Sequence, residues 1–362
     1  MTVQDERVSR QGWAVHPGEH LAEHLEAREL SQAEFARLAG LTPKLVSTII
    51  AGKNPVTAET AVRFERVLGL KAYIWVGLQA AWDLQEERRR EFEHEAMPEA
   101  WLKGVPLSEL QRRGALPITS DSTELTNAFL GFLGIGSPRS FVSFYSSLAV
   151  HYRRSRSYSA SDLHVACWLR LGELRVAGRS APSFDREKFR NALSAIRKLT
   201  VARPEDFEPR LKAECERAGV FLVFEKPLPK TSLYGSARWL PSGNAMIQMS
   251  LRMRTNDHFW WTFFHEAGHV LLHQGCTFVD DEGGDGSDLE KQADEFAEEL
   301  LVGRERFRRF VELRPRSATQ ITTFANDVGI APGIIVGMLQ HVGAIPYRNL
   351  NGLKVRLGWS DE

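Results

Sequence analysis

Three histidines and a glutamate lie within the apolar stretch FWWTFFHEAGHVLLHQ, residues 259–274. His265 and His269 are four residues apart, so on a helix they share one face, about 5–6 Å apart, and can present two imidazole nitrogens to one metal ion. Glu266, about 100° around the helix from His265, can lie over the same ion without binding it. The pattern predicts a zinc-activated water, with Glu266 as the base that takes its proton.

A catalytic zinc ion takes three protein ligands and keeps one position open. The segment LEKQADEFAEELL, downstream of a glycine-rich stretch, predicts a second helix on which Glu290 and Asp294 are again four residues apart. We predict Glu290 as the third ligand and Asp294 as the carboxylate that accepts a histidine N–H and fixes its tautomer. His273 lies too far along the helix to bind the ion together with His265, and it is interpreted as a supporting or core histidine.

Each of these patterns has a simpler explanation when taken alone. Sequences of the form HExxH occur by chance, and an acidic pair on a helix is commonly a solvated face. The two patterns in succession are more specific than either one.

The elements that must position these residues begin with a change of hydrophobic pattern at Val220. VFLVF predicts a short buried strand, and GSARWLPSGNAMIQMSL predicts two strands around a Pro-Ser-Gly turn. A helix is expected to open near residues 256–257. We expect an extended peptide to pair with the strand around residues 245–250. Tyr234 and Arg238 are only neighbours of that strand, and the sequence names no residue that stabilises an oxyanion.

This part of the chain resembles the ImmA/IrrE family of metallopeptidases from about residue 220 to residue 357. Three blocks carry the resemblance: TFFHEAGHVLLH, EKQADEFAEELLV and ITTFANDVGIAPGIIVGMLQHVGAIPYRNLNGLKVRL. The resemblance implies a gluzincin-like site with zinc, or another divalent metal, on His265, His269 and Glu290, and with Glu266 as general base. It also implies a repressor-type protein as substrate. At position 294 this chain has Asp where the family often has Asn.

The N-terminal part predicts a helix, a tight turn and a second helix in SQAEFARLAGLTPKLVSTIIAGKN. Ser31 can cap the first helix, which is expected to end at Gly40. Thr42 can cap the second, with Pro43 at its first position. The apolar pattern places the polar residues of the second helix on its outer side.

Local basic charge accompanies this pattern. Between residues 36 and 71 there are six Lys or Arg against two Glu, a net charge of +4 in a neutral chain. The residues that we expect to contact DNA are Gln32, Thr42, Lys44, Ser47, Thr48, Lys53 and Asn54.

Residues 10–85 resemble the XRE-type helix-turn-helix family, and within it the HigA-like antitoxins. The resemblance rests on the blocks HPGEHLAEHLEARELSQAEFARLAGL, AGKNPVTAETAVRFERVLGL and WVGLQAAWDLQ. It implies double-stranded DNA as a partner and a homodimer that binds a palindromic site. The alternative is a helical bundle without affinity for DNA.

Two further segments have no assigned chemistry. Residues 95–215 predict mostly helices, and YRRSRSYS at 152–159 is interpreted as an exposed loop, with a nucleic-acid contact as the alternative. The block FANDVGIAPGIIVGMLQ repeats the small-residue spacing of the first helix-turn-helix, with Ala325 and Gly329 in the positions of Ala36 and Gly40. Its expected outer face has no Lys or Arg, so we predict a packing role.

Composition excludes several classes of protein. Lys and Arg number 46, as do Asp and Glu, so global charge does not indicate a nucleic-acid or membrane partner. The three cysteines form no CxxC pair and are expected to be buried and reduced. No segment has the pattern of a signal peptide or of a membrane span. The sequence predicts a cytoplasmic protein with no membrane contact.

These observations predict a mainly α protein with a small β-sheet. The expected domains are a helix-turn-helix bundle at 1–92, a helical middle region of unknown role at 93–215 and a zincin-like metallopeptidase domain at 216–362. The predicted function is a DNA-binding transcriptional regulator with a zinc-dependent endopeptidase domain that acts on a repressor-type protein or on itself. The alternative is a HigA-like antitoxin or repressor whose metal domain is a non-catalytic sensor or scaffold.

Overall fold

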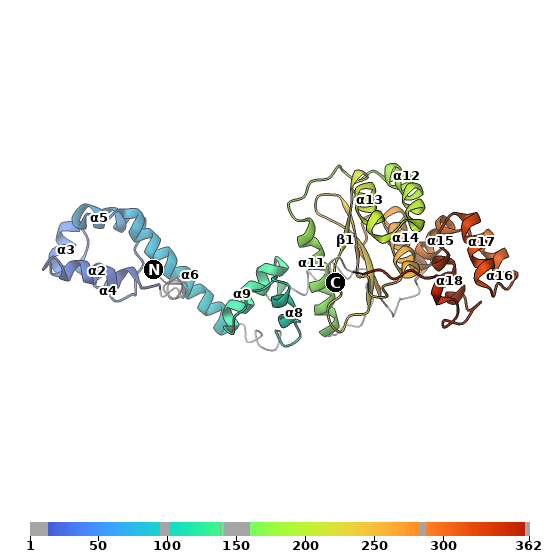
Figure 1. Ribbon diagram of the computed structural model, residues 1–362. Helices are drawn as coiled ribbons and strands as arrows, with labels where there is room; N and C mark the ends of the chain where they lie inside the picture. Colours follow the sequence, from blue (N-terminus) through green and yellow to red (C-terminus); the bar gives the residue numbers. More distant parts are fainter. Residues whose placement is uncertain (1–13, 95–101, 138, 141–159, 282–286, 359–362) are drawn as a thin grey trace. The chain divides into compact units, whose positions relative to one another are not determined.

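The structure is a computed structural model, and it describes residues 14–94, 102–137, 139–140, 160–281 and 287–358 (Figure 1). The chain divides into two compact units, residues 1–98 and residues 99–362. The basic-aromatic segment at 152–159 lies outside the described residues. The expected class, mainly α with a small sheet, is confirmed.

The first unit is a bundle of helices around a small apolar core. Its buried centre includes Phe35, Phe64 and Trp75, whose rings pack edge to face. The charged run after residue 84 continues the last helix. The helices are α2 (Pro17–Glu26), α3 (Gln32–Ala39), α4 (Pro43–Ile50), α5 (Ala58–Leu68) and α6 (Ala72–His94).

The predicted helix-turn-helix is present in α3 and α4. The hydroxyl of Ser31 accepts the N–H of Glu34, and the hydroxyl of Thr42 accepts the N–H of Leu45. Gly40 ends α3 in the left-handed conformation that glycine adopts without strain. The helix boundaries therefore follow from local capping chemistry.

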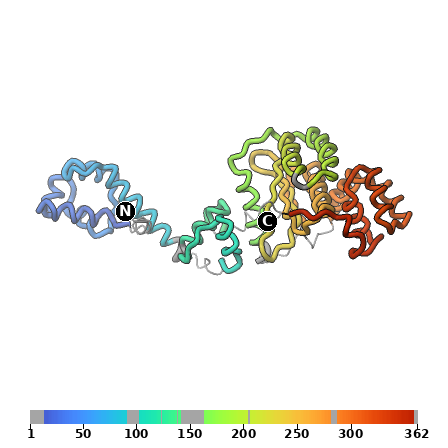
Figure 2. Tube along the Cα trace, viewed as in Figure 1, coloured from blue at the N-terminus to red at the C-terminus, as the bar shows by residue number. Residues whose placement is uncertain are grey.

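The second unit holds a mixed sheet among helices (Figure 2). Its elements before the third strand are α8 (Leu107–Arg112), α9 (Ser122–Leu133), α11 (Ala160–Val176), α12 (Arg186–Arg197), η1 (Lys198–Val201), α13 (Pro204–Arg217), β1 (Val220–Phe224) and β2 (Leu233–Trp239). The remaining elements are β3 (Ala245–Met249), α14 (Asn256–Leu272), β4 (Phe278–Asp281), α15 (Asp288–Leu301), α16 (Arg304–Glu312), α17 (Ala318–Val328), α18 (Pro332–His341) and η2 (Asn351–Leu353).

The strand order is β1-β3-β2-β4, with β1 parallel to β3 and the other neighbours antiparallel. The expectation that a peptide pairs with the strand at 245–250 is wrong. β3 pairs with β1 along one edge and with β2 along the other, from Ala245 to Met249. Both sets of backbone hydrogen bonds are thus already used. The outer strands of the described sheet are β1 and β4.

Helices cover the sheet on both faces. Ala245 and Ile247 of β3 belong to the apolar core that also contains α14. Gln248, the next residue after Ile247, points to the other face of the sheet, is fully buried and donates to the carbonyl oxygen of Trp168 on α11. Gly172 of α11 lies so close to Gln248 that an added Cβ would be 2.0 Å from its amide oxygen. α11 therefore packs tightly on the face of the sheet opposite α14.

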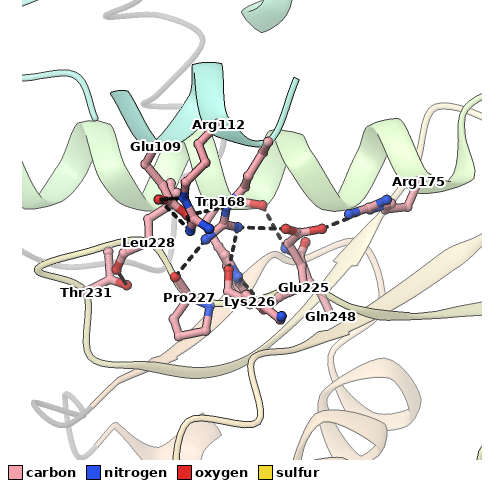
Figure 3. Close-up of polar contacts among 11 residues, drawn as sticks. Glu109, Arg112, Trp168, Arg175, Glu225, Lys226, Pro227, Leu228, Thr231 and Gln248 are labelled. Atoms are coloured by element: carbon pink, nitrogen blue, oxygen red, sulfur yellow. Dashed lines mark hydrogen bonds and ion pairs between the residues drawn. The ribbon is translucent and has the colours of Figure 1, made fainter. Parts of the chain in front are cut away.

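A buried carboxylate ties α8 and α11 to the end of β1 (Figure 3). Glu225 accepts hydrogen bonds from Arg113 at 2.7 Å and from Arg175 at 3.0 Å. Its carbonyl oxygen accepts the indole N–H of Trp168 at 3.1 Å. These contacts join segment 93–215 to segment 216–362 within one compact unit. The domain boundaries at residues 92 and 215 stay predictions.

The C-terminal pair α17 and α18 has a helix-turn-helix shape with Gly329 in the left-handed conformation between its helices. Its expected outer residues Gly333 and Val336 are buried, and Gly333 lies against Asn256 at the start of α14. The pair packs on α14, in line with the predicted packing role.

All three cysteines are free, and Cys167 and Cys215 are buried. Cys276 is only partly buried, because it lies in the turn that follows α14. In the described part of the chain no single helix is long and apolar enough to cross a membrane, and α17 with α18 passes that test only as a bent pair.

Candidate metal centre

The site is built where α14 and α15 pack side by side. Ser287 caps α15 and accepts the N–H of Glu290, which fixes where that helix begins. Gly268 faces the contact between the helices. A Cβ at Gly268 would lie 3.1 Å from Phe296 and 3.2 Å from Ala293. The absence of a side chain at Gly268 therefore lets α15 bring Glu290 close to the histidines of α14.

Three ligand-type atoms converge between the helices. Nε2 of His265 lies 3.0 Å from Nε2 of His269 and 3.0 Å from Oε2 of Glu290, and Nε2 of His269 lies 3.3 Å from the same oxygen. Zinc binds such atoms at about 2.0–2.2 Å, which places two ligands of a tetrahedral site roughly 3.3–3.5 Å apart. The triangle leaves a point at zinc-bond distance from all three atoms. The residues thus fit a zinc-sized cation.

Hydrogen bonds behind the two imidazoles orient their lone pairs toward this point. Nδ1 of His265 lies 2.9 Å from a carboxylate oxygen of Asp294, so Nδ1 carries the proton of the neutral ring. Nε2 of His273 lies 3.2 Å from the amide oxygen of Gln292, so that nitrogen is also protonated. Nδ1 of His273 is then an acceptor for Nδ1–H of His269, 3.0 Å away. Both Nε2 atoms are left as metal ligands.

Glu266 lies in the core of this unit beside the site. Its side chain is fully buried, and neither carboxylate oxygen has a hydrogen-bond partner in the described part of the chain. A Cβ at Gly235 of β2 would lie 2.4 Å from Oε1 of Glu266, so this glycine makes room for the carboxylate. An unpartnered buried carboxylate is costly unless it gains a proton or a polar neighbour. Glu266 therefore has free acceptors where a base is required.

Burial and neighbouring charges perturb the acid and base groups of the site. Burial raises the pKa of Glu266 well above its ordinary value. Burial lowers the pKa of His269 to about 4, so its ring is neutral at pH 7.

For His265 and Glu290 burial is the largest single influence on the pKa, but the hydrogen bonds to two partners and the neighbouring charges together outweigh it. Burial lowers the pKa of His265, but hydrogen bonds to Asp294 and Glu290 raise it well above the ordinary value. Burial raises the pKa of Glu290, but hydrogen bonds to both histidines lower it well below its usual range. In the metal-free protein a proton on His265 supplies the positive charge that a bound cation would bring.

β4 borders the same site. The ring of Phe278 stacks on the imidazole of His269, with centroids 3.8 Å apart and planes inclined by 16°. The negative charge of Asp280 raises the pKa of both His265 and Glu266, which places this carboxylate in the field of the site. By contrast, Arg238 is buried away from the site in an ion pair with Glu173 on α11, 2.7 Å long.

Four residues of the site were not anticipated: Gln292, Gly235, Phe278 and Gly268. Gln292 lies two residues before Asp294 on the predicted helix, but its partner His273 is at the C-cap of α14, where side-chain direction cannot be read from helical spacing. Gly235 and Phe278 depend on strand order. Gly268 lies within HExxH itself, and a small residue in that position is the one signal available in the sequence.

The residues expected to contact DNA lie in the first unit. Gln32, Lys44 and Ser47 are exposed, as are Lys53 and Asn54 beyond the end of α4. Thr42 is exposed, and Thr48 is half-buried. Thr42 is occupied as the cap of α4, and the hydroxyl of Thr48 donates to the backbone oxygens of Lys44 and Leu45. Lys44, Ser47, Lys53 and Asn54 form a polar strip along α4 and the turn after it, whereas Gln32 lies at the start of α3.

Comparison with protein families gives one match in each unit. A helix-turn-helix family model matches residues 21–75. A model described as an IrrE N-terminal-like domain, of the M78 peptidases, matches residues 215–339.

Two curated relatives match over the first unit. The HTH-type transcriptional regulator YddM of Escherichia coli (strain K12) is 34% identical over 73 residues, which is 20% of this chain and 78% of that protein. Virulence-associated protein I of Dichelobacter nodosus is 36% identical over 73 residues, 20% of this chain and 68% of that protein.

Two solved structures are also similar over this region. The antitoxin GraA is 30% identical, with a TM-score of 0.22 and coverage of 22% of this chain and 87% of that one. A HigA-family addiction module antidote protein from Coxiella burnetii is 30% identical, with a TM-score of 0.21 and coverage of 24% and 97%.

Proposed function

Because this chain belongs to the helix-turn-helix family of transcriptional regulators and carries an IrrE N-terminal-like domain of the M78 peptidases, we propose that it is a DNA-binding regulator with a zinc-dependent endopeptidase domain. The proposed substrate is either a separate repressor-type protein or the helix-turn-helix unit of this chain itself. The DNA target places the proposed activity in the cytoplasm.

One observation carries the peptidase proposal. His265, His269 and Glu290 converge on a point that fits a cation. Glu266, which follows His265 on α14, carries a buried carboxylate without a hydrogen-bond partner in the described part of the chain. A structural histidine cluster needs no unpaired base beside it, since burying an unpaired carboxylate destabilises the fold. The combination matches the requirements of metal-assisted hydrolysis.

Each side chain has a distinct role in the proposed reaction. His265, His269 and Glu290 would hold the metal ion, which acidifies a water molecule and polarises the substrate carbonyl when bound. Glu266, whose raised pKa brings it closer to neutral pH, would take the proton of the water and pass it to the leaving amine. Asp294 and His273 would keep the two imidazoles in the required tautomers.

A peptide substrate has to approach an outer strand, because β3 is paired along both edges. Of the two outer strands, β4 borders the site through the stack of Phe278 on His269. We therefore propose that the scissile segment lies along β4 rather than along β3.

Replacing the base tests this proposal. Glu266→Gln has nearly the same shape, removes the proton acceptor and leaves all three ligands in place. We expect the variant to retain the bound zinc of the wild type, measured by metal analysis, and to lose cleavage of candidate repressors and of the chain itself. Glu312→Gln, at an exposed glutamate of α16, is the matched control. Cleavage that survives Glu266→Gln at the wild-type rate excludes Glu266 as the base.

The second candidate function is that of a repressor or antitoxin-like protein whose metal domain is a sensor or a structural scaffold and catalyses no reaction. It is favoured by the curated relatives, both of which match over the helix-turn-helix region. In this case operator binding persists after metal removal, and no peptide bond is cut by the zinc-loaded wild type. Assays of DNA binding and of proteolysis, each with and without chelator, separate the two functions.

For DNA contact we propose the exposed strip of α4, with Lys44 on a phosphate and Ser47 near a base edge. α4 is the second helix of the helix-turn-helix, the helix that enters the major groove in this motif. Lys53 and Asn54 extend the strip beyond the helix end. Thr42 and Thr48 contribute less to this proposal, because their hydroxyls already bond to the backbone.

We also propose a homodimer, paired through an apolar stripe on α6. Tyr73 and Leu84 are 74% and 58% exposed, with Val76 at 40% between them. In an antiparallel two-fold pair of α6 helices, Tyr73 would meet Leu84, Val76 would meet Ala81, and Gly77 would meet Ala80. Large residues would face large ones and small residues small ones, which is the self-complementarity that an isologous interface requires.

A matched pair of substitutions tests the α6 interface. Val76→Glu places a charge in the stripe, whereas Val62→Glu places one at a valine of α5 that is 41% exposed and outside the stripe. We expect Val76→Glu to sediment as a monomer and Val62→Glu to remain dimeric. If both variants sediment with the same mass as the wild type, α6 does not form the interface.

A further inference from the structure

A cavity of about 290 Å³ lies beside the metal centre and is not used in the proposed hydrolysis. It is enclosed by α14, α15, α16, α18 and the chain that follows α18. Asp294 takes part in its wall and also bonds to Nδ1 of His265. The cavity is therefore next to the site, but behind the face of His265 that points to the metal position.

Apolar side chains form most of the cavity wall. Trp261 of α14, Phe307 of α16 and Ile334 of α18 contribute, together with Met338 and Val342. Removing such a surface from contact with water is favourable, so the cavity favours a ligand with an apolar body. The volume accommodates a group the size of a phenyl ring with a short alkyl chain.

The charges of the lining are unbalanced. Asp257, Asp294, Glu295 and Glu298 line the cavity, and Lys354 is the one ammonium among the lining residues of the described chain. Arg304 reaches two of these carboxylates from outside, at 3.1 Å from Glu295 and 3.6 Å from Glu298. His258 and His341 also face the cavity. The excess of carboxylates favours a cationic ligand.

Asp257, a residue of the cavity wall, has one carboxylate oxygen without a hydrogen-bond partner in the described structure. Its side chain is 4% exposed, and Oδ2 accepts from the ammonium of Lys354 at 2.6 Å. Its other oxygen, Oδ1, is buried with no hydrogen-bond partner in the described structure. Gly337 leaves the space for this side chain, since a Cβ there would lie 2.5 Å from Oδ2. A buried acceptor without a donor is unusual in a folded protein.

The wall near Asp257 is held in place by hydrogen bonds. Lys354 also donates to Oε1 of Gln340 at 2.7 Å. The amide nitrogen of Gln340 donates to the carbonyl oxygens of Tyr347 and Asn349 at 3.1 and 2.9 Å. Gln340 thereby fixes the segment after α18, which contributes Val342, Tyr347 and Lys354 to the wall. The cavity is formed by fixed residues and does not depend on the metal ligands.

We propose that this cavity binds an organic cation: a protonated amine attached to an apolar, phenyl-sized body. The amine faces the carboxylates of α15, and the apolar body lies against Trp261, Ile334 and Met338. The same chemistry occurs in a free aromatic amine and in a lysine side chain of a bound peptide. The proposal does not depend on hydrolysis, so it is testable in the Glu266→Gln variant as well.

Calorimetric titration of the zinc-loaded full chain tests the site with three probes. 2-Phenylethylamine carries both features, 2-phenylethanol lacks the charge, and acetyl-Ala-Lys-Ala-amide presents the amine on a peptide. We expect the amine to bind at least tenfold more tightly than the alcohol. If the peptide binds more tightly than the free amine, a peptide side chain is the natural occupant, and the reverse order identifies a small molecule. Equal binding of amine and alcohol overturns the proposal.

Three variants locate the binding. Glu298→Gln removes one lining charge and is expected to weaken amine binding about fivefold. Glu299→Gln, on the same helix but outside this lining, should leave it unchanged. Val342→Trp fills the cavity from a position that is 53% exposed, so the fold is retained, and amine binding should be lost. Full amine affinity in Val342→Trp places the ligand elsewhere and refutes the site.

Discussion

Replacing His273 by leucine should weaken zinc binding although His273 touches no metal. Its Nδ1 accepts the proton of His269 Nδ1 at 3.0 Å, in a part of the site where His269 is 1% exposed. Without this acceptor His269 either buries an unsatisfied N–H, at a cost of about 1–3 kcal/mol, or moves its proton to the nitrogen that must bind the metal. Loss of such outer partners lowers metal affinity about 10- to 100-fold, or roughly 1.4–2.7 kcal/mol.

The control for this prediction is His273→Asn. The amide oxygen of asparagine can take the position of Nδ1 and accept the same proton, whereas leucine cannot. Zinc affinity is measured by competition with a chelating dye at fixed pH, and thermal unfolding of the metal-free proteins shows that both variants fold. We expect the leucine variant to bind zinc at least tenfold more weakly than the asparagine variant. If the two variants bind zinc equally, the tautomer argument is wrong.

Three further predictions concern pH, DNA and stability. Zinc must displace the proton that His265 holds because of its raised pKa. The apparent zinc affinity should therefore rise about tenfold per pH unit below that pKa and level off above it. A zinc affinity that stays constant from pH 5 to 8 would contradict the assigned protonation. Lys44→Ala should reduce the slope of log K against log salt by about 0.9, the value of one phosphate contact, while Lys71→Ala leaves the slope unchanged. Glu225→Ala removes the buried carboxylate that accepts hydrogen bonds from Arg113 and Arg175, while Arg113 keeps Glu109 as a second carboxylate partner at 2.6 Å. The free energy of unfolding should fall by about 2 kcal/mol in denaturant titrations, and a change under about 1 kcal/mol would refute this role.

The parts of the site that share one helix were predictable from the sequence. Helical periodicity alone places His265 and His269 on one face, and the same spacing places Glu290 and Asp294 on another helix. Helix limits were also predictable, because Ser31, Thr42 and the glycine at 40 act on their own neighbours in the chain.

The parts that depend on pairing between distant segments were not predictable. A hairpin was expected for β2 and β3, but nothing local indicates that β1 occupies the other edge of β3. For that reason the strand expected to receive a peptide turned out to be central. The roles of Gly235 and Phe278 likewise follow from where β2 and β4 lie, which is decided by the whole core.

The middle region shows the same limit. Its helices were expected from the sequence, whereas their role in covering the sheet was not. Gln248 and Glu225 are polar residues at buried positions, and their partners on α8 and α11 are 50 or more residues away in the sequence. Only the tertiary structure shows that these side chains hold two segments together.

Gly268, which is not one of the proposed ligands, determines how closely the two helices that carry those ligands approach each other. Its missing methyl group lets α15 approach α14, and a methyl group there would push Phe296 and Ala293 away by a few tenths of an ångström. Glu290 would move with them, and the distance between its carboxylate and the two histidine nitrogens would increase. The geometry of the proposed metal site thus depends on the backbone separation of two helices as well as on the chemical identity of the ligand residues.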